Sequence, residues 1–374
     1  MNKIKNTHMV KRILVVGQTP PPFGGQALML QSLLELKFDY VQLFHLDMKF
    51  SKDFNHMGSF KPYKFWVLFK TIIFAWFYKF YFKTDILYYA PSGPNKLAVY
   101  RDILLLFPIR FLFKKTIFHS HAGGTSQVYN SLSPILKFFY RVSFFKPDGL
   151  IKLTNYSHGD EDLLRPEKCF IVPNGIKDHF YDIAFKSNNN SKVNILYVGA
   201  MYPERGINEL INACHILNKE AINFHLNLMG VFFQSSYKNE IIDLINRYKL
   251  QSKISFLGSK TGLKKWRIYN ESDILCFPSY VPSESFGLVV VEAMQFKIPV
   301  VASNWNGIAN IVDNNETGLL CDPKSSISLK DNLKILILDK DKRIKMGTRG
   351  REIFLERYGL DQFKLNMQNV FSDI

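Results

Sequence analysis

The stretch from Pro278 to Asp322 constrains the fold of this chain most strongly, because it joins a loop, a buried helix and two short strands. Residues 287–294 (GLVVVEAM) are apolar apart from one glutamate, which predicts a buried helix. Residues 297–303 (KIPVVAS) and 317–320 (TGLL) each predict a short buried strand, with an Asn306-Gly307 turn between them. Such alternation of buried helix and short apolar strands is typical of an α/β domain with a parallel sheet.

Two carboxylates and a glycine in this stretch predict a site for a phosphate-bearing ligand. Glu284 and Glu292 are eight positions apart, which is about 12 Å along a helix. Gly287 lies at the first helical turn, where backbone N–H groups are unpaired, the dipole is positive and a phosphate can approach closely. A ligand with hydroxyls at both ends and phosphate in the middle, such as a nucleotide sugar, fits this arrangement. The alternative is a pair of solvated glutamates.

This stretch resembles the donor-binding signature of the retaining glycosyltransferases of family 4, the E-x(7)-E group with the GT-B fold. It keeps nearly every fixed letter of the pattern P-S-x-x-E-x-F-G-x-x-x-x-E-A-M-x-x-x-x-P-V-V-A-S. The resemblance implies that Glu284 holds the donor sugar hydroxyls as part of the catalytic group, and that Glu292 binds the ribose diol. It also implies that Phe286, Gly287 and Leu288 bind the donor.

The first half of the chain carries two further matches to this family. Gly24 and Gly25 follow the predicted strand 11–17, where the resemblance implies a glycine pair that faces the donor phosphate and the acceptor. The alternative is a tight turn. The strand predicted over 116–121 ends at a histidine before a glycine turn, and the resemblance implies that it reaches the donor sugar. His121 matches this position better than His119, and we expect it to be catalytic.

A phosphate-binding loop of the family is only partly present. Its pattern V-G-R-L-x-x-x-K-G is matched here by V-G-A-M-Y-P-E-R-G, so Arg205 takes the lysine position and Ala200 replaces the arginine. Arginine can bind phosphate through two parallel hydrogen bonds. One cation is nevertheless missing, unless another basic residue such as Lys260 replaces it.

The length of 374 residues suits two domains of roughly 150–200 residues each. The resemblance implies the GT-B fold, in which two Rossmann-like, doubly wound α/β domains face a cleft. We expect an acceptor-binding domain over 1–184 and a donor domain over 185–355. The last segment, 356–374, is predicted to be a helix that packs back on the first domain, and the asparagine-rich stretch 185–192 is predicted to be the linker.

Basic residues are concentrated in the first half of the chain. Residues 1–150 hold 20 Lys and Arg against 7 Asp and Glu, whereas the rest holds 28 against 25. Residues 60–83 combine five lysines with dense aromatics and no acid, which favours a helix lying in the headgroup layer of a membrane. The alternative is a buried helix of the Rossmann domain. Residues 100–115 are similar in character, and no nucleic-acid-binding motif accompanies the basic half.

Together with these observations, the resemblance implies a retaining, metal-independent hexosyltransferase that uses a nucleotide sugar, with a UDP-sugar favoured and a GDP-sugar as the other option. The acceptor is expected to be a saccharide or a polyprenyl-linked sugar in the synthesis of a cell-surface polysaccharide such as a capsule or lipopolysaccharide. No cofactor, metal or nucleic-acid partner is expected. Four scattered cysteines fit a reducing cytoplasm, and the basic half predicts peripheral association with the inner membrane face.

Two other functions remain open at the level of sequence. A nucleotide-sugar epimerase of GT-B fold would carry the same donor site, but it would not need a basic, aromatic first domain. An inactive, membrane-bound scaffold in a polysaccharide assembly complex is favoured only by Ala200. The paired glutamates and His121 argue against that scaffold.

Overall fold

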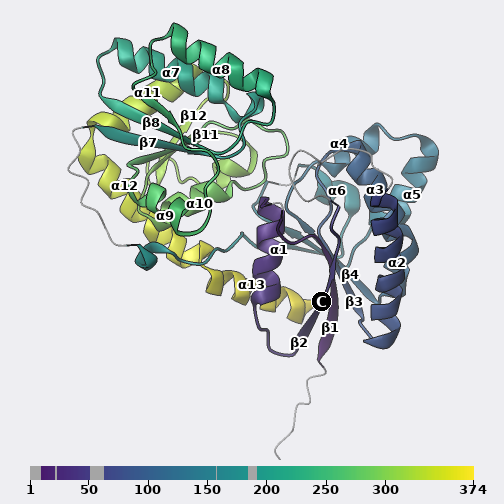
Figure 1. Ribbon diagram of the computed structural model, residues 1–374. Coiled ribbons are helices and arrows are strands. Elements are labelled where there is room, and N and C mark those ends of the chain that lie inside the picture. The colour runs from purple at the N-terminus through teal and green to yellow at the C-terminus, as the bar shows by residue number, and fades with distance from the viewer. Residues whose placement is uncertain (1–9, 22, 51–62, 157, 184–191) are drawn as a thin grey trace, which may run out of the picture. The chain divides into compact units, whose positions relative to one another are not determined.

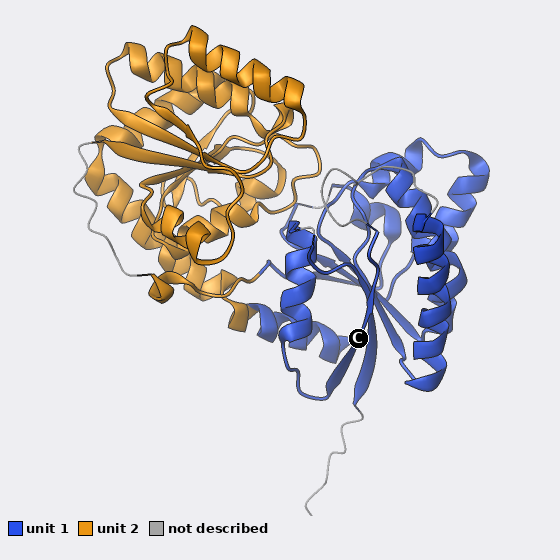
Figure 2. Cartoon of the chain, in the orientation of Figure 1, with its two compact units in different colours: residues 1–174, 363–374 blue, residues 175–362 orange. Residues whose placement is uncertain are grey.

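The computed structural model describes residues 10–21, 23–50, 63–156, 158–183 and 192–374. The chain forms two compact units, of which the first comprises residues 1–174 and 363–374 and the second residues 175–362 (Figure 2). The first unit thus ends ahead of the boundary expected at residue 184. The linker expected over 185–192 lies almost wholly outside the described residues.

Unit 1 is built on a parallel six-stranded sheet with the order β2-β1-β3-β4-β5-β6. The central strand β1 buries Ile13, Leu14, Val15 and Val16 completely, as a strand covered on both faces requires. Residues 13–16 of β1 lie beside residues 86–89 of β3. The six strands are β1 (Lys11–Gly17), β2 (Val41–Asp47), β3 (Ile86–Tyr89), β4 (Lys115–Ser120), β5 (Gly149–Lys152) and β6 (Lys168–Ile171).

Helices cover both faces of this sheet (Figure 1). Two neighbouring residues of β3 show which helices lie on each face. Tyr88 faces Phe371 of the last helix, at 6.4 Å between ring centroids. The next residue, Tyr89, points to the opposite face and donates a hydrogen bond to Asp102 of α3. The helices of this unit are α1 (Gly25–Glu35), α2 (Tyr63–Tyr81), α3 (Lys96–Ile109), η2 (Arg110–Leu112), α4 (Thr125–Asn130), α5 (Pro134–Phe144) and α6 (Asp160–Leu164).

Unit 2 repeats this architecture with the strand order β12-β11-β10-β7-β8-β9. Its strands are β7 (Val193–Val198), β8 (Phe224–Met229), β9 (Ile254–Phe256), β10 (Ile274–Phe277), β11 (Val300–Ser303) and β12 (Gly318–Cys321). Its helices are η3 (Phe180–Asp182), η4 (Pro203–Arg205), α7 (Ile207–Lys219), α8 (Ser235–Arg247), α9 (Gly262–Asn270), α10 (Leu288–Gln295), η5 (Asn306–Asn310), α11 (Ser326–Leu338), α12 (Lys340–Ile353) and the π-helical turn η6 (Phe354–Tyr358). Two doubly wound, Rossmann-like α/β units confirm the predicted fold class.

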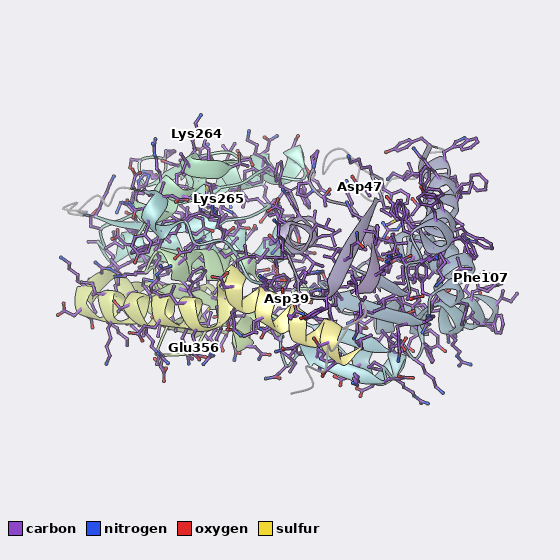
Figure 3. The ribbon with its side chains drawn as sticks, turned by 90° about the horizontal axis from the view of Figure 1, so that it is seen from below. Asp39, Asp47, Phe107, Lys264, Lys265 and Glu356 are labelled. Atoms are coloured by element: carbon purple, nitrogen blue, oxygen red, sulfur yellow. The ribbon has the colours of Figure 1, made fainter. Side chains whose placement is uncertain are left out.

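The last helix, α13 (Leu360–Asp373), begins in unit 2 and is counted with unit 1 from Phe363 onward. Its end is held against unit 1 by two hydrogen bonds from Lys11 Nζ to the carbonyl oxygens of Phe371 and Ser372, at 2.8 and 2.9 Å. Asp39, labelled beside this helix in Figure 3, exchanges backbone hydrogen bonds with the side chain of Gln368.

The described part of the aromatic segment 60–83 forms α2, while residues 60–62 lie outside the described chain. The second aromatic segment, 100–115, forms most of α3 and the short helix η2. Among the helices that the structure describes, none is both long enough and apolar enough to cross a membrane.

Candidate active site

The strand order of the unit 2 sheet reverses between β7 and β10, and the residues predicted to bind the donor lie at this point. The chain adds β8 and β9 on one side of β7 and then crosses to place β10 on the other side. Ligands of open α/β sheets bind outside the carboxyl ends of the strands at such a switch point. The loop after β7 carries Arg205 and the loop after β10 carries Glu284.

The backbones of these two loops are in close contact. Gly206 follows Arg205 with φ +74°, and a Cβ built there would lie 2.2 Å from the carbonyl oxygen of Pro278. Only glycine fits a left-handed position with a carbonyl so near. This contact brings the end of the first loop to the beginning of the second.

Arg205 and Glu284 form an ion pair, with 2.5 Å between Arg205 Nη1 and Glu284 Oε2. Ser279 Oγ lies 3.4 Å from the same Nη1 and donates to the same carboxylate oxygen at 3.3 Å. The guanidinium also lies over the rings of Tyr202 and Phe277, at 5.4 and 5.9 Å from their centroids. The side chains are 22% and 13% exposed, so the pair is shielded yet open on one side.

The pKa of Arg205 is raised above its ordinary value by a balance of opposing effects. Burial alone would lower it, but the Glu284 carboxylate and the nearby phenols of Tyr197 and Tyr202 outweigh that effect. Arg205 is therefore always charged. Its Nε is buried and makes no hydrogen bond to another described residue.

Helix α10 starts next to this pair. Gly287 precedes its first residue with φ +84°, and Phe286 is buried with its ring edge-on to Tyr358. The backbone N–H groups of Leu288 and the residues after it form the N-terminal end of this eight-residue helix. Such an end attracts anions through its unpaired donors and its dipole.

Glu292 lies one turn further along α10 and is held by two side chains from α9. Lys265 forms an ion pair with Oε1, and the phenol of Tyr269 donates to Oε2 at 2.6 Å. Burial and the Glu292 carboxylate raise the pKa of Tyr269 well above its ordinary value, so this phenol keeps its proton. In Figure 3 the adjacent Lys264 projects outward from α9.

Lys265 and Tyr269 are functional candidates that sequence reasoning missed. They are spaced four residues apart and so share one face of α9. That spacing is their only signal in the sequence, and it does not identify their partner.

In unit 1, His121 follows β4 and lies beside the buried His119, with 4.0 Å between the ring centroids. His119 is hydrogen-bonded to the phenol of Tyr88 and is fully buried. His121 is partly exposed, and its buried Nδ1 has no hydrogen-bond partner among the described residues. Burial lowers the pKa of His121 to about 4, so its imidazole is neutral at pH 7.

Gly24 and Gly25 begin α1 at the switch point of the unit 1 sheet, between β1 and β3. Gly24 has φ −95°, and a Cβ built on it would meet no atom within 4 Å. Neither backbone strain nor packing against the described residues therefore requires glycine at this position. The role of facing a ligand stays a prediction for Gly24 and Gly25.

Two D-x-D sequences occur in the chain, and each begins with an aspartate that has a structural role. Asp160 accepts hydrogen bonds from the backbone N–H groups of Gly124 and Ser126. Asp339 caps helix α12 by accepting from the N–H of Lys342. Among the described residues, no three His, Cys, Asp or Glu side chains gather closely enough to hold a metal ion.

Comparison with known proteins gives matches in sequence and in fold. Residues 181–353 match the family described as "Glycosyl transferases group 1". An uncharacterized glycosyltransferase of Methanocaldococcus jannaschii is 25% identical over 240 residues, which cover 64% of this chain and 63% of the relative. The capsular polysaccharide biosynthesis glycosyltransferase CapM of Staphylococcus aureus is 25% identical over 201 residues, covering 54% of this chain and 50% of CapM. The chain thus spans about half to just under two thirds of these relatives.

The solved structure of Anabaena Alr3699/HepE in complex with UDP and glucose superimposes with a TM-score of 0.73 at 18% identity. The superposition covers 97% of this chain and 99% of HepE, and at this identity it shows the fold alone. Residues 181–353 therefore carry the signature of the group 1 glycosyl transferases, within a chain that has the two-unit GT-B fold.

Proposed function

We propose that this protein is a retaining, metal-independent glycosyltransferase of family 4 that transfers a hexose from a nucleotide sugar. The observation that carries the proposal is the Arg205–Glu284 pair at the switch point of unit 2, next to the start of α10. A fixed cation, free helix N–H groups and a carboxylate on neighbouring loops suit a diphosphate that is attached to a sugar.

In this proposal Arg205 and the first turn of α10 bind the diphosphate and stabilise the negative charge that develops as it leaves. Preorganised donors aimed at developing charge are usually the largest catalytic contribution. Arrival of the diphosphate gives Arg205 a second anionic partner, so Glu284 can turn to the hydroxyls of the sugar. Phe286, Gly287 and Leu288 shape the same end of the helix.

Glu292 is proposed to accept hydrogen bonds from the ribose diol. Lys265 and Tyr269 each occupy one of its oxygens, and each carboxylate oxygen has a further lone pair for a ribose hydroxyl. The two α9 side chains thus hold the carboxylate oriented before the nucleotide arrives.

His121 is proposed to contact the donor sugar as a neutral imidazole. A neutral ring can accept a hydrogen bond from a hydroxyl through one nitrogen, which an imidazolium cannot do. Retention of configuration enters the proposal through the family resemblance and not through the geometry.

The donor is proposed to be a UDP-sugar, with a GDP-sugar as the other option. HepE, which shares the fold, binds UDP and glucose in its solved complex. The acceptor is proposed to be a saccharide or a polyprenyl-linked sugar of a cell-surface polysaccharide. CapM is named for capsular polysaccharide biosynthesis, which supports that context.

Ala200 favours the inactive scaffold as the second candidate. Its carbonyl accepts a hydrogen bond from Tyr197 at 2.8 Å, and its side chain supplies no cation where the family has arginine. The exposed Lys260, on the loop before α9, is the residue that we propose as its replacement.

Donor hydrolysis by the purified full chain, measured over a panel of nucleotide sugars in EDTA, tests the proposal. One donor should be hydrolysed slowly without added metal. Arg205→Ala should abolish most of this activity, Arg205→Lys should retain more of it, and Lys264→Ala is the control cation that should change nothing. Lack of hydrolysis with every donor would favour the scaffold. Activity that needs Mg²⁺ or Mn²⁺ would overturn metal independence, and epimerised sugar would identify an epimerase.

A further inference from the structure

Helix α2 has its aromatic side on the outside, which reverses the usual pattern of a surface helix. Its inner side packs on the sheet through small or aliphatic residues, of which Leu68, Thr71 and Ala75 are buried. The large side chains that are at least two-fifths exposed recur every three or four residues. They are Tyr63, Phe65, Trp66, Phe69, Ile73, Phe74, Trp76, Phe77, Phe80 and Tyr81.

Two neighbouring helices extend this aromatic side. Helix α3 packs between α2 and α5 on the same face of the unit 1 sheet (Figure 1). The exposed residues of α3 and η2 include Leu104, Phe107 and Phe111, and those of α5 include Ile135 and Phe138. Figure 3 places Phe107 at the outer edge of this layer. We call the exposed apolar residues of α2, α3, η2 and α5 the three-helix surface.

The charge of this region is strongly positive. Residues 63–147 contain twelve Lys or Arg, two Asp and no Glu, a balance of +10. Both aspartates are already neutralised: Asp85 by Lys79 at 3.1 Å and Lys114 at 3.3 Å, and the buried Asp102 by Arg101. Just beyond this range Asp148 pairs with Lys115 at 3.1 Å, and Arg110 is buried. Apart from Lys114, the exposed cations of the region are Lys70, Lys83, Lys96, Arg141 and Lys146.

We propose that the three-helix surface docks in the headgroup layer of an anionic lipid bilayer. Trp, Tyr and Phe favour the boundary between headgroups and acyl chains, and lysines beside them attract anionic lipids. Lys70, which lies over the ring of Phe74, can extend its charge to the headgroups while its stem stays among the aromatics.

A second copy of this chain fits the surface less well than a bilayer. Two such surfaces face to face would bring together two regions of net positive charge, which repel each other. A bilayer supplies the opposite charge and an apolar layer at the same time. It also accepts a long, flat contact, since the 19 residues of α2 extend about 28 Å along the surface.

This docking deepens the proposed function, because a transferase held at a bilayer can reach an acceptor that carries a lipid. That consequence for the acceptor rests on the proposed function. The docking itself does not rest on the proposed function, because it is argued only from the residues of the three-helix surface.

Flotation of the full chain with vesicles tests the docking. Vesicles of phosphatidylglycerol and phosphatidylcholine should carry the protein, vesicles of phosphatidylcholine alone should carry much less, and rising salt should release it. Replacement of Phe69, Phe77 and Phe80 by serine should release the protein. The matched control replaces three apolar residues of unit 2 with comparable exposure by serine, namely Ile327, Leu338 and Ile344, and should still float.

Charge is tested separately with Lys70→Gln, which should weaken partitioning about fivefold, whereas Lys264→Gln should leave it unchanged. Nucleotide-sugar hydrolysis without lipid should persist in all of these variants, so loss of docking and failure of the proposed function are distinguishable. A wild-type chain that never floats would overturn the proposal. So would a serine variant that still floats, or a lipid-free dimer that the phenylalanine substitutions convert to monomer.

Discussion

At the scale of single residues, the contacts of Glu292 determine what its removal should do. Glu292→Ala should weaken UDP binding by about 1.5–3 kcal/mol, because the ribose loses a charged acceptor. Calorimetry with UDP and 2′-deoxy-UDP measures this: the wild type should discriminate between the two nucleotides, and the variant should not. Equal loss of affinity for both would mean that Glu292 acts only through the packing of Lys265 and Tyr269.

The titration of His121 gives a second prediction at this scale. Its pKa is lowered to about 4 in the folded chain from an ordinary value of 6.5. The unfolded chain therefore takes up this proton first as the pH falls. The contribution of the neutral His121 imidazole to the free energy of unfolding is fully present above about pH 6.5 and is lost as the pH falls through 4.

Urea unfolding at pH 7 and pH 5 measures the effect, with His121→Asn as the variant without this titration. The wild type should lose about 2 kcal/mol more stability than the variant between these two pH values. His119 is retained in both proteins, and burial, which is the larger cause of its lowered pKa, is present in both, so most of its contribution cancels in the comparison. An equal loss in both would show that His121 titrates normally in the folded chain.

Spacing along the sequence could locate Glu284, Glu292 and Arg205, because the family pattern fixes their positions. It could not predict that Arg205 and Glu284 pair with each other in the structure. That contact arises from the strand order, which places β7 beside β10. The partners of Glu292 on α9 were missed for the same reason: they come from packing between helices and not from a motif.

At the scale of elements, two glycines at helix starts should respond differently to alanine. Gly287→Ala should lower stability by about 1–2 kcal/mol, since φ is +84° and the new Cβ would lie 3.2 Å from the Phe277 ring. Gly24→Ala should leave stability unchanged, because its φ is ordinary and the space is open. Thermal unfolding measures both.

Donor hydrolysis by the same two variants distinguishes a glycine that binds a ligand from one that only shapes the backbone. If Gly24 faces a ligand, Gly24→Ala should reduce hydrolysis without a change in melting temperature. Full activity in Gly24→Ala would restore the alternative of a simple turn.

Helix α2 shows where the sequence was ambiguous about an element. Ten of the 19 residues 63–81 are aromatic and five more are aliphatic, so periodicity could not distinguish a buried helix from one at an interface. In the structure the helix has an inner side in the core and an outer, exposed aromatic side, and its contact with a membrane stays a prediction. The two strands and the helix expected between 287 and 320 were predictable because their apolar runs are short and bounded by turns.

At the scale of the whole molecule, the last residues of the chain complete the first unit. Phe371 is fully buried, and its ring lies edge-on to Phe38 at 5.3 Å. A chain that ends at Gln362 should lose several kcal/mol in unit 1, since removal of one buried Phe alone costs about 3–5 kcal/mol. Unit 2 should keep its stability.

Hydrogen exchange, measured separately over peptides of the two units, checks this expectation. Protection should fall in β1, β3 and β4 and stay unchanged in β7, β8 and β10. A uniform loss over both units would mean that the two unfold as one.

The return of the chain to unit 1 also sets an order for its synthesis. Residues 175–362 form one continuous unit and can complete their sheet while the ribosome is still attached. The N-terminal unit is made first, yet it must wait for residues 363–374, which are made after the whole of unit 2. During that interval the site for Phe371 beside Tyr88 and Phe38 stays open, so the newly made N-terminal half is the part that chaperones must protect.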